Sequence, residues 1–357
     1  MRKILLIIVA ALFVAINAGA QGCAEPSSED GVTVFGFMQA QYDYGFTEGD
    51  NTSTFGFNRA RIGAMGVIPY DFSYYFLLET SPFKKDGPKA YLLDAFITYG
   101  RYPFLKVSVG SFKSPFGQEL STPCHGLHTI HRSLFVNELS APDRDMGLML
   151  LGGSDTTLFQ YSLAYMNGTG LLVEDKDKYK DVVGRLIVHP LDWLQVAGSF
   201  RFGKSTSADE TVEEPDERKR FGADFQIEKY GFLVQGEYIW AEDIGSYLVG
   251  GGCGGDPELV QGSVKRQGLS IMALYNLTYN FQPVIKYENY DDDADSKWYL
   301  FEGAGPNGNN NVKQVTTFGF NYFFNEWTRL QVNYEYRADG INEVKNDMLM
   351  VQLQVRF

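Results

Sequence analysis

Short segments in which apolar and polar residues alternate recur along almost the whole chain, and this recurrence constrains the fold more than any other feature. In FQYSLAYMN, the apolar residues at 159, 161, 163 and 165 alternate with Gln160, Ser162 and Ala164. A period of two is the spacing of side chains on one face of a β-strand. The segments with this character are Val32–Asp43, Thr54–Met65, Phe72–Thr80, Ala90–Tyr99, Leu105–Phe112, Met146–Leu151, Leu158–Asn167, Val182–His189, Leu194–Gly203, Arg220–Glu228, Phe232–Ala241, Gly268–Tyr275, Phe281–Tyr290, Val315–Phe323, Arg329–Arg337 and Met348–Phe357.

The connections between these segments alternate in length. Those after even-numbered segments are short, such as VIPYD, GRYPF and KYG, whereas those after odd-numbered segments are mostly long, such as YGFTEGDNTS and KSTSADETVEEPDERK. All long connections therefore lie at one end of the structure, as in outer-membrane barrels. A sheet can cross lipid only if it closes on itself, because every backbone group must be paired. The sequence predicts an all-β fold, a 16-stranded antiparallel transmembrane β-barrel.

The last segment fits this fold well. In DMLMVQLQVRF, Val351, Leu353 and Val355 share one face with Phe357, and polar residues take the other face. We expect this strand to pair with the first strand and to close the barrel, with its apolar face toward lipid and Phe357 at the periplasmic interface.

The first residues have the character of a secretory signal. Arg2 and Lys3 precede an apolar run, and Ala18-Gly19-Ala20 offers a small-residue cleavage site. We expect residues 1–20 to be a cleaved signal peptide, 21–31 a short N-terminal lead and 32–357 a single barrel domain. Lipidation of Cys23 is an alternative reading of the same region.

Charge and cysteine content restrict the possible partners. Without Arg2 and Lys3, 29 of the 31 Lys and Arg residues remain against 44 acidic residues, a net charge of −15. Nucleic acid is excluded as a partner for so acidic a chain. Three cysteines do not form a disulfide framework. Cys124 and Cys253 could pair in an oxidising compartment or remain free thiols.

Two motifs resemble one bacterial porin family. Arg59-Ala60-Arg61-Ile62-Gly63 lies in an early strand, and Gly110-Ser111-Phe112-Lys113-Ser114-Pro115-Phe116-Gly117 ends the fifth. Both are similar to segments of the phosphate-selective porin O and P family, and the terminal Phe357 fits as well. The resemblance implies a 16-stranded barrel, a homotrimer and passive diffusion of small solutes.

Several charged residues are candidates for the wall of such a channel. Arg59 and Arg61 alternate with Ala60 and Ile62, so both arginines are predicted to point into the lumen, because an Arg at the lipid midplane costs about 2–4 kcal/mol. They either attract anions or pair with acids of the lumen. The predicted pore-lining and constriction residues are Arg59, Arg61, Lys113, Arg132, Arg144, Glu79, Asp94 and Arg201.

The longest connection follows the fifth segment and begins at Lys113. A connection of this length without a fold of its own is usually functional, and we expect it to fold inward and narrow the pore. Its charges, among them Arg132 and Arg144, either set a transverse field that screens solutes or hold the loop on the wall through salt bridges.

Other patterns in the sequence give weaker support for a function. Cys124, His125, His128 and His131 have ligand chemistry that suits zinc, but their spacing fixes no geometry in a loop, so we predict no metal and no cofactor. The run DDDADS lacks the glycine and distal glutamate of a calcium loop, which leaves loose divalent binding or a solvated loop. The chain contains no Gly-x-Ser-x-Gly and no recognisable order of Ser, His and Asp, so we predict no enzyme.

Together these features predict a porin in the outer membrane of a Gram-negative bacterium. Small hydrophilic solutes or ions would cross its water-filled channel passively, with anions such as phosphate as candidate solutes. The expected partners are these solutes, outer-membrane lipid and two further copies of the chain in a homotrimer. The alternative is a secreted or lipid-anchored β-protein that binds saccharide.

Overall fold

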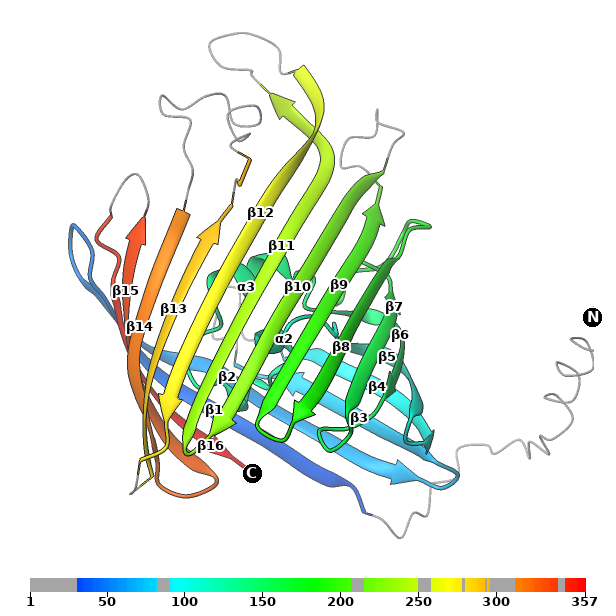
Figure 1. The fold of residues 1–357 in the computed structure, drawn as a ribbon, viewed down its shortest axis with the longest axis horizontal. Coiled ribbons are helices and arrows are strands. Elements are labelled where there is room, and N and C mark those ends of the chain that lie inside the picture. The colour runs from blue at the N-terminus through cyan, green and yellow to red at the C-terminus, as the bar shows by residue number, and fades with distance from the viewer. Residues whose placement is uncertain are drawn as a thin grey trace, which may run out of the picture.

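The computed structural model is a closed β-barrel whose sixteen strands follow one another around the ring (Figure 1). It describes residues 31–81, 90–206, 215–249, 258–277, 280–292, 294–295, 312–339 and 344–357. The predicted signal peptide, Cys23, Cys253 and part of the acidic run 291–296 lie outside these residues. No helix in the described part of the chain is long and apolar enough to cross a membrane.

Each predicted strand segment is a strand of the barrel, with shifted ends. The strands are β1 (Thr33–Gly45), β2 (Thr52–Ile68), β3 (Phe72–Glu79), β4 (Tyr91–Tyr102), β5 (Leu105–Lys113), β6 (Arg144–Gly152), β7 (Phe159–Met166), β8 (Asp181–Leu191), β9 (Leu194–Ser205), β10 (Asp216–Lys229), β11 (Phe232–Val249), β12 (Glu258–Tyr275), β13 (Phe281–Asp291), β14 (Val312–Phe323), β15 (Thr328–Asp339) and β16 (Met348–Arg356). The predicted fold class is confirmed.

The barrel closes where β1 pairs with β16 in antiparallel register. The backbone N–H of Gly36 donates to the carbonyl of Phe357 at 2.9 Å, and the N–H of Phe357 donates back to Gly36 at 3.0 Å. Gly36 has no side chain, and a Cβ there would lie 2.7 Å from Cζ of the Phe357 ring. The expected pairing of the last strand with the first is therefore confirmed, and the terminal ring covers the seam.

The two faces of the barrel differ as the alternation requires. On β15 the side chains of Arg329, Gln331, Asn333 and Glu335 are buried in the interior. Outward aromatic side chains stack with neighbours near the ends of the strands, as in the pair Phe232–Tyr275 with ring centroids 4.3 Å apart. Apolar side chains exposed on the outside and polar ones packed inside are the pattern of a barrel that faces lipid.

The long connections lie at the end of the barrel opposite the short turns (Figure 1). One predicted connection was wrong in extent. The region 242–267 was expected to be a loop, but β11 and β12 continue pairing as far as Val249 and Glu258. Strands of 18 residues are longer than the bilayer requires, so this hairpin projects beyond the membrane.

Candidate functional site

The connection between β5 and β6, residues 114–143, folds into the barrel and is called the inner loop below. It carries the helices α2 (Gln118–Ser121) and α3 (Leu134–Leu139) and a short 3-10 helix, η1 (Cys124–Gly126). Figure 1 shows α2 and α3 within the ring of strands, and α3 contacts β11, β12 and β13. At its base, the N–H of Ser114 donates to the carbonyl of Asp143 at 2.8 Å. The expectation that this loop folds inward is confirmed.

Apolar side chains hold the inner loop against one side of the barrel interior. Phe116, Leu120 and Phe135 are buried in a cluster with Val183 and Ile239 from the strands. Burying a large apolar side chain stabilises a fold by about 1.5–3 kcal/mol. Opposite Phe135 stands Gly268, where any Cβ would collide with the Phe135 ring. The lumen therefore contains an apolar core that fastens the loop.

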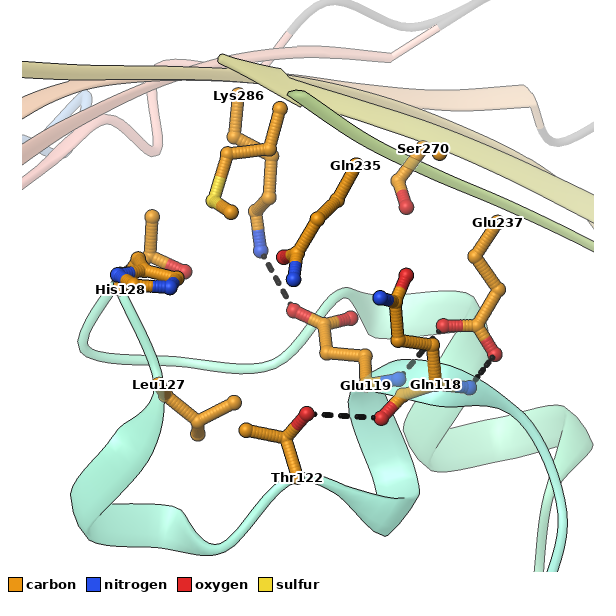
Figure 2. Close-up of a pocket in the computed structure, with 12 residues that line it drawn as sticks. Gln118, Glu119, Thr122, Leu127, His128, Gln235, Glu237, Ser270 and Lys286 are labelled. Carbon is orange, nitrogen blue, oxygen red and sulfur yellow. Dashed lines mark hydrogen bonds and ion pairs between the residues drawn. The ribbon is translucent and has the colours of Figure 1, made fainter. Parts of the chain in front are cut away.

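Inward polar side chains bind both ends of the inner loop through its backbone. The carboxylate of Glu237 accepts hydrogen bonds from the N–H groups of Gln118 at 3.1 Å and Glu119 at 2.8 Å (Figure 2). The Arg201 guanidinium donates to the carbonyls of Ser140 at 2.7 Å and Pro142 at 2.8 Å. These bonds satisfy backbone groups that have no partner within a short helix or turn.

The middle of the loop is held in the same way by later strands. Asn333 accepts from the N–H of Ile130 at 2.7 Å, and Glu288 accepts from the N–H of Leu134 at 2.9 Å. The Arg329 guanidinium donates to the carbonyl of His125 at 2.8 Å. Anchors on β9, β11, β13 and β15 place the loop along the β9–β16 side of the lumen.

Between this wall and the loop lies a cavity of about 30 Å³. Figure 2 shows Lys286 directed toward Glu119 there, and their Nζ and Oε1 atoms are 3.2 Å apart. A cavity of this size holds no more than about two water molecules. It is part of the packing of the loop against this wall.

The opposite face of the inner loop meets four cationic side chains, Arg59, Arg61, Lys113 and Arg132, called the basic cluster below. All four are half-buried. Arg59 Nη1 donates to Gln39 Oε1 at 3.0 Å, and Lys113 Nζ donates to the carbonyl of Thr122 at 3.4 Å. Within the described chain, the carboxylate that pairs with this cluster is Glu79, 2.7 Å from Arg61 Nε. Arg61 thus has an acidic partner in Glu79, whereas Arg59 hydrogen-bonds to a neutral amide.

The sulfur of Cys124 lies at the centre of the basic cluster. It accepts from Arg61 Nη1 at 3.2 Å and from Arg132 Nη2 at 3.4 Å. Burial by itself raises the pKa of the Cys124 thiol, but Arg59, Arg132, Arg61 and Lys113 outweigh burial and lower that pKa to about 6. Cys124 is a free, buried cysteine, and it is mostly a thiolate at neutral pH.

The histidines of the inner loop add no metal site. Burial lowers the pKa of His128 to about 4, so its imidazole is neutral at physiological pH. The His125 ring packs against Phe37, with ring centroids 5.2 Å apart. No group of three or more potential ligands gathers in the described part of the chain.

Three of the predicted pore-lining residues, Arg144, Asp94 and Arg201, are buried in the packing of the barrel interior. Arg144 is 4% exposed and pairs with Asp94 at 2.9 Å, and Asp94 is itself buried. Arg201 is 1% exposed and lies behind the inner loop. The alternation places Arg201 in the interior correctly, but it does not tell which strands the loop covers.

On the side of the long connections, the inner loop borders a cavity of about 450 Å³. Arg132 and His131 contribute to its lining from the loop, and Glu288, Lys313 and Arg337 from β13, β14 and β15. Arg132 thus belongs both to the basic cluster and to this wider cavity.

The anchoring residues were missed at the sequence level. Glu237, Glu288 and Asn333 stand on the polar parity of their strands, which is the one signal they give. A polar residue that faces water and one that binds a loop have the same parity, so the pattern cannot separate them.

Comparisons with known proteins agree with this architecture. Residues 32–173 match the family model of the phosphate-selective porins O and P. No curated protein matches the chain. Among solved structures, an anion-selective porin from Comamonas acidovorans aligns with a TM-score of 0.66 and 14% identity, over 92% of this chain and 100% of that one.

Two further structures have a similar fold. The outer-membrane channel DcaP of Acinetobacter baumannii aligns with a TM-score of 0.63 at 11% identity, over 92% of this chain and 97% of its own. The trimer form of OmpT from Vibrio cholerae aligns with a TM-score of 0.62 at 14% identity, over 92% and 100%. At these identities the likeness concerns the fold. The match of residues 32–173 to the phosphate-selective porin O and P model, together with the closed barrel and its inner loop, supports an outer-membrane channel with a porin fold.

Proposed function

We propose that small hydrophilic solutes cross this channel by passive diffusion and that the basic cluster favours anions among them. The inner loop is fastened along the β9–β16 side by its buried core and backbone hydrogen bonds. We infer that the water-filled path passes the basic cluster, where Arg59, Arg61 and Lys113 project from the wall and Arg132 from the inner loop.

One observation carries the preference for anions. The cluster sets the guanidinium groups of Arg59, Arg61 and Arg132, with Lys113 beside them, against Glu79 and the Cys124 thiolate. The three guanidinium groups alone outnumber the two anions, so the cluster keeps a net positive charge. A unit charge about 4 Å from a cation gains about 1 kcal/mol even in water, which corresponds to a severalfold difference between anion and cation at the narrowest point. The anion-selective porin from Comamonas acidovorans has the same fold.

The acidic composition of the chain acts in the opposite direction. A net charge of −13 attracts cations toward the mouth of the channel, but at 0.1–0.15 M salt charges are screened over about 8–10 Å. The basic cluster acts at contact distance and is screened less. The sign of the selectivity is therefore expected to follow the cluster at high salt.

A planar lipid bilayer that contains the purified channel, under a KCl gradient, tests this proposal. We expect a reversal potential of the sign given by chloride permeability, at high salt and near neutral pH. A reversal potential on the potassium side under these conditions would contradict the anion preference, while conductance without any preference would leave only the passive channel.

We also propose that residues 1–20 direct export, with 21–31 as a short lead, and that the barrel assembles as a homotrimer. A trimer form exists for OmpT from Vibrio cholerae. In electrophoresis without heating, the extracted protein is expected to run as an SDS-resistant species near three times the chain mass and to shift to the monomer on heating. A single band at the monomer position in both samples would argue against the trimer.

The saccharide-binding alternative has weaker support. Its aromatic residues would have to line a pocket of a soluble protein, whereas rings such as Phe202 and Phe221 pack edge to face on the exposed outer wall. Such rings are typical of the aromatic girdles of a membrane barrel.

A further inference from the structure

The outer wall of β7–β10 carries an apolar strip close to the long-connection end of the barrel. Tyr165 pairs in register with Val182, and Val182 with Phe202. Tyr165 is 57% exposed and Phe202 is 43% exposed. The Phe202 ring contacts Phe221 on the next strand, with centroids 5.4 Å apart. This strip lies where the aromatic girdle meets the outer leaflet of the membrane.

Directly beyond the strip, toward the long connections, lies an open cavity of about 390 Å³. Tyr165, Val182 and Phe202 form its apolar floor. Its outward-facing charged lining consists of one acid, Glu217, and four lysines, Lys178, Lys180, Lys204 and Lys219; Arg218 also borders it, but the Arg218 guanidinium is directed to Asp181 inside the barrel. On a chain with a net charge of −13, this concentration of cations on one patch of the outer wall is unusual.

Carboxylates near the cavity hold several of these cations in place. Glu217 lies 2.5 Å from Lys204 Nζ and 3.5 Å from Lys219 Nζ. Lys219 also lies 3.8 Å from Glu242, and Arg218 lies 3.7 Å from Asp181. The side chains of Lys204 and Lys219 remain 50% and 36% exposed, so their ammonium groups can still reach a ligand.

The remaining two cations come from the connection between β7 and β8. Lys180 Nζ donates to Asp175 at 2.6 Å, and this hydrogen bond raises the pKa of Lys180, which keeps it charged. Lys178 stands over the Tyr179 ring, with Nζ 5.3 Å from the centroid. The four lysines thus surround an opening whose floor continues into the lipid-facing wall.

We propose that this cavity binds the phosphorylated sugar headgroup of an anionic glycolipid in the outer leaflet, with the acyl chains along Tyr165, Val182 and Phe202. Ammonium groups recognise phosphate as point charges, and each Lys or Arg near an anionic membrane surface contributes to binding. The apolar floor favours a lipid over free phosphate, since a soluble anion would leave Tyr165 and Phe202 without a partner.

The test uses the full-length folded barrel in detergent and diphosphoryl lipid A as the probe, with bound lipid counted by native mass spectrometry. The variant carries Lys178→Gln, Lys204→Gln and Lys219→Gln. Its matched control carries Arg101→Gln, Lys229→Gln and Arg356→Gln at the short-turn end. We expect the first triple variant to bind about tenfold more weakly or worse, because it loses three cations, and the control to bind like the wild type.

Two further arms define what would overturn the proposal. Dephosphorylated lipid A is expected to bind weakly, and inorganic phosphate is expected to displace the lipid poorly. Equal binding by the lysine variant or by the dephosphorylated lipid would refute the site, and ready displacement by inorganic phosphate would assign it to free phosphate instead. A charge-retaining variant, with Lys→Arg at 178, 204 and 219, should bind the lipid; if it does not, charge is not what holds the headgroup.

Discussion

Replacing residues 115–142 with an Asn-Gly turn is expected to increase the single-channel conductance severalfold. Ser114 and Asp143 are already hydrogen-bonded to each other, so a tight turn can join β5 to β6 without moving either strand. The lumen loses α2, η1 and α3, and water takes their place. Conductance in planar bilayers measures the effect.

The same variant is expected to lose stability. Apolar side chains that pack against the inner loop, such as Val183 and Ile239, become exposed to water. In gel electrophoresis the band of the unfolded chain is therefore expected after heating to a lower temperature than for the wild type. Shortening the outer connection 46–51 in the same way serves as the control and should leave conductance near the wild-type value. Unchanged conductance without the inner loop would mean that the loop does not set the width of the channel.

Changing Arg59→Gln together with Arg61→Gln is expected to move the reversal potential in a KCl gradient strongly toward potassium. The wild-type cluster sets four cations against Glu79 and the Cys124 thiolate. In the variant, Lys113 and Arg132 remain, and Glu79 loses its partner and keeps its negative charge in the path. The local excess of positive charge is then small, and the acidic residues elsewhere in the chain determine the preference.

Arg101→Gln is the matched control for this variant. Arg101 lies near Asp71 at a short turn, with a side chain that is 61% exposed, and its replacement removes one positive charge far from the inner loop. We expect no change in reversal potential for this control. A double variant that behaves like the control would show that Arg59 and Arg61 do not face the ion path.

The strands could be predicted from the sequence because lipid and the interior impose opposite demands on neighbouring residues. Beyond the membrane these opposite demands are absent, and the alternation of apolar and polar residues ends. Residues such as Glu242, Asp243 and Lys265 pair in the extended hairpin of β11 and β12, but the hairpin stands beyond the membrane and needs no apolar face. Polar residues in water show the same sequence pattern whether they belong to a paired strand or to a loop.

The residues of the candidate site could be named from the sequence, but their arrangement in space could not. Arg59, Arg61, Lys113 and Arg132 could each be named from strand parity or from the long connection. The same reasoning included Arg144 and Arg201, because it shows which side chains point inward and not where the inner loop lies. Phe116 and Phe135, which decide that position, read as ordinary loop residues until Val183 and Ile239 are known to face them.

The role of Cys124 shows a further limit. The sequence suggested only a disulfide bond or a zinc ligand as roles for its thiol. Its contacts with Arg61 and Arg132 join a loop residue to a strand 63 positions earlier and to another loop position. Such a contact across the lumen depends on the tertiary course of the chain, and no local pattern records it.

The seam between Gly36 and Phe357 has a consequence for biogenesis. It joins residues whose sequence separation is nearly the whole length of the barrel, and loop closure over such a distance is slow. Until residues 348–357 have been synthesised and delivered, β1 offers an unpaired edge that could template association with other chains. A periplasmic chaperone that shields the first strands, or a membrane machine that holds that edge open until the last strand arrives, would meet this need.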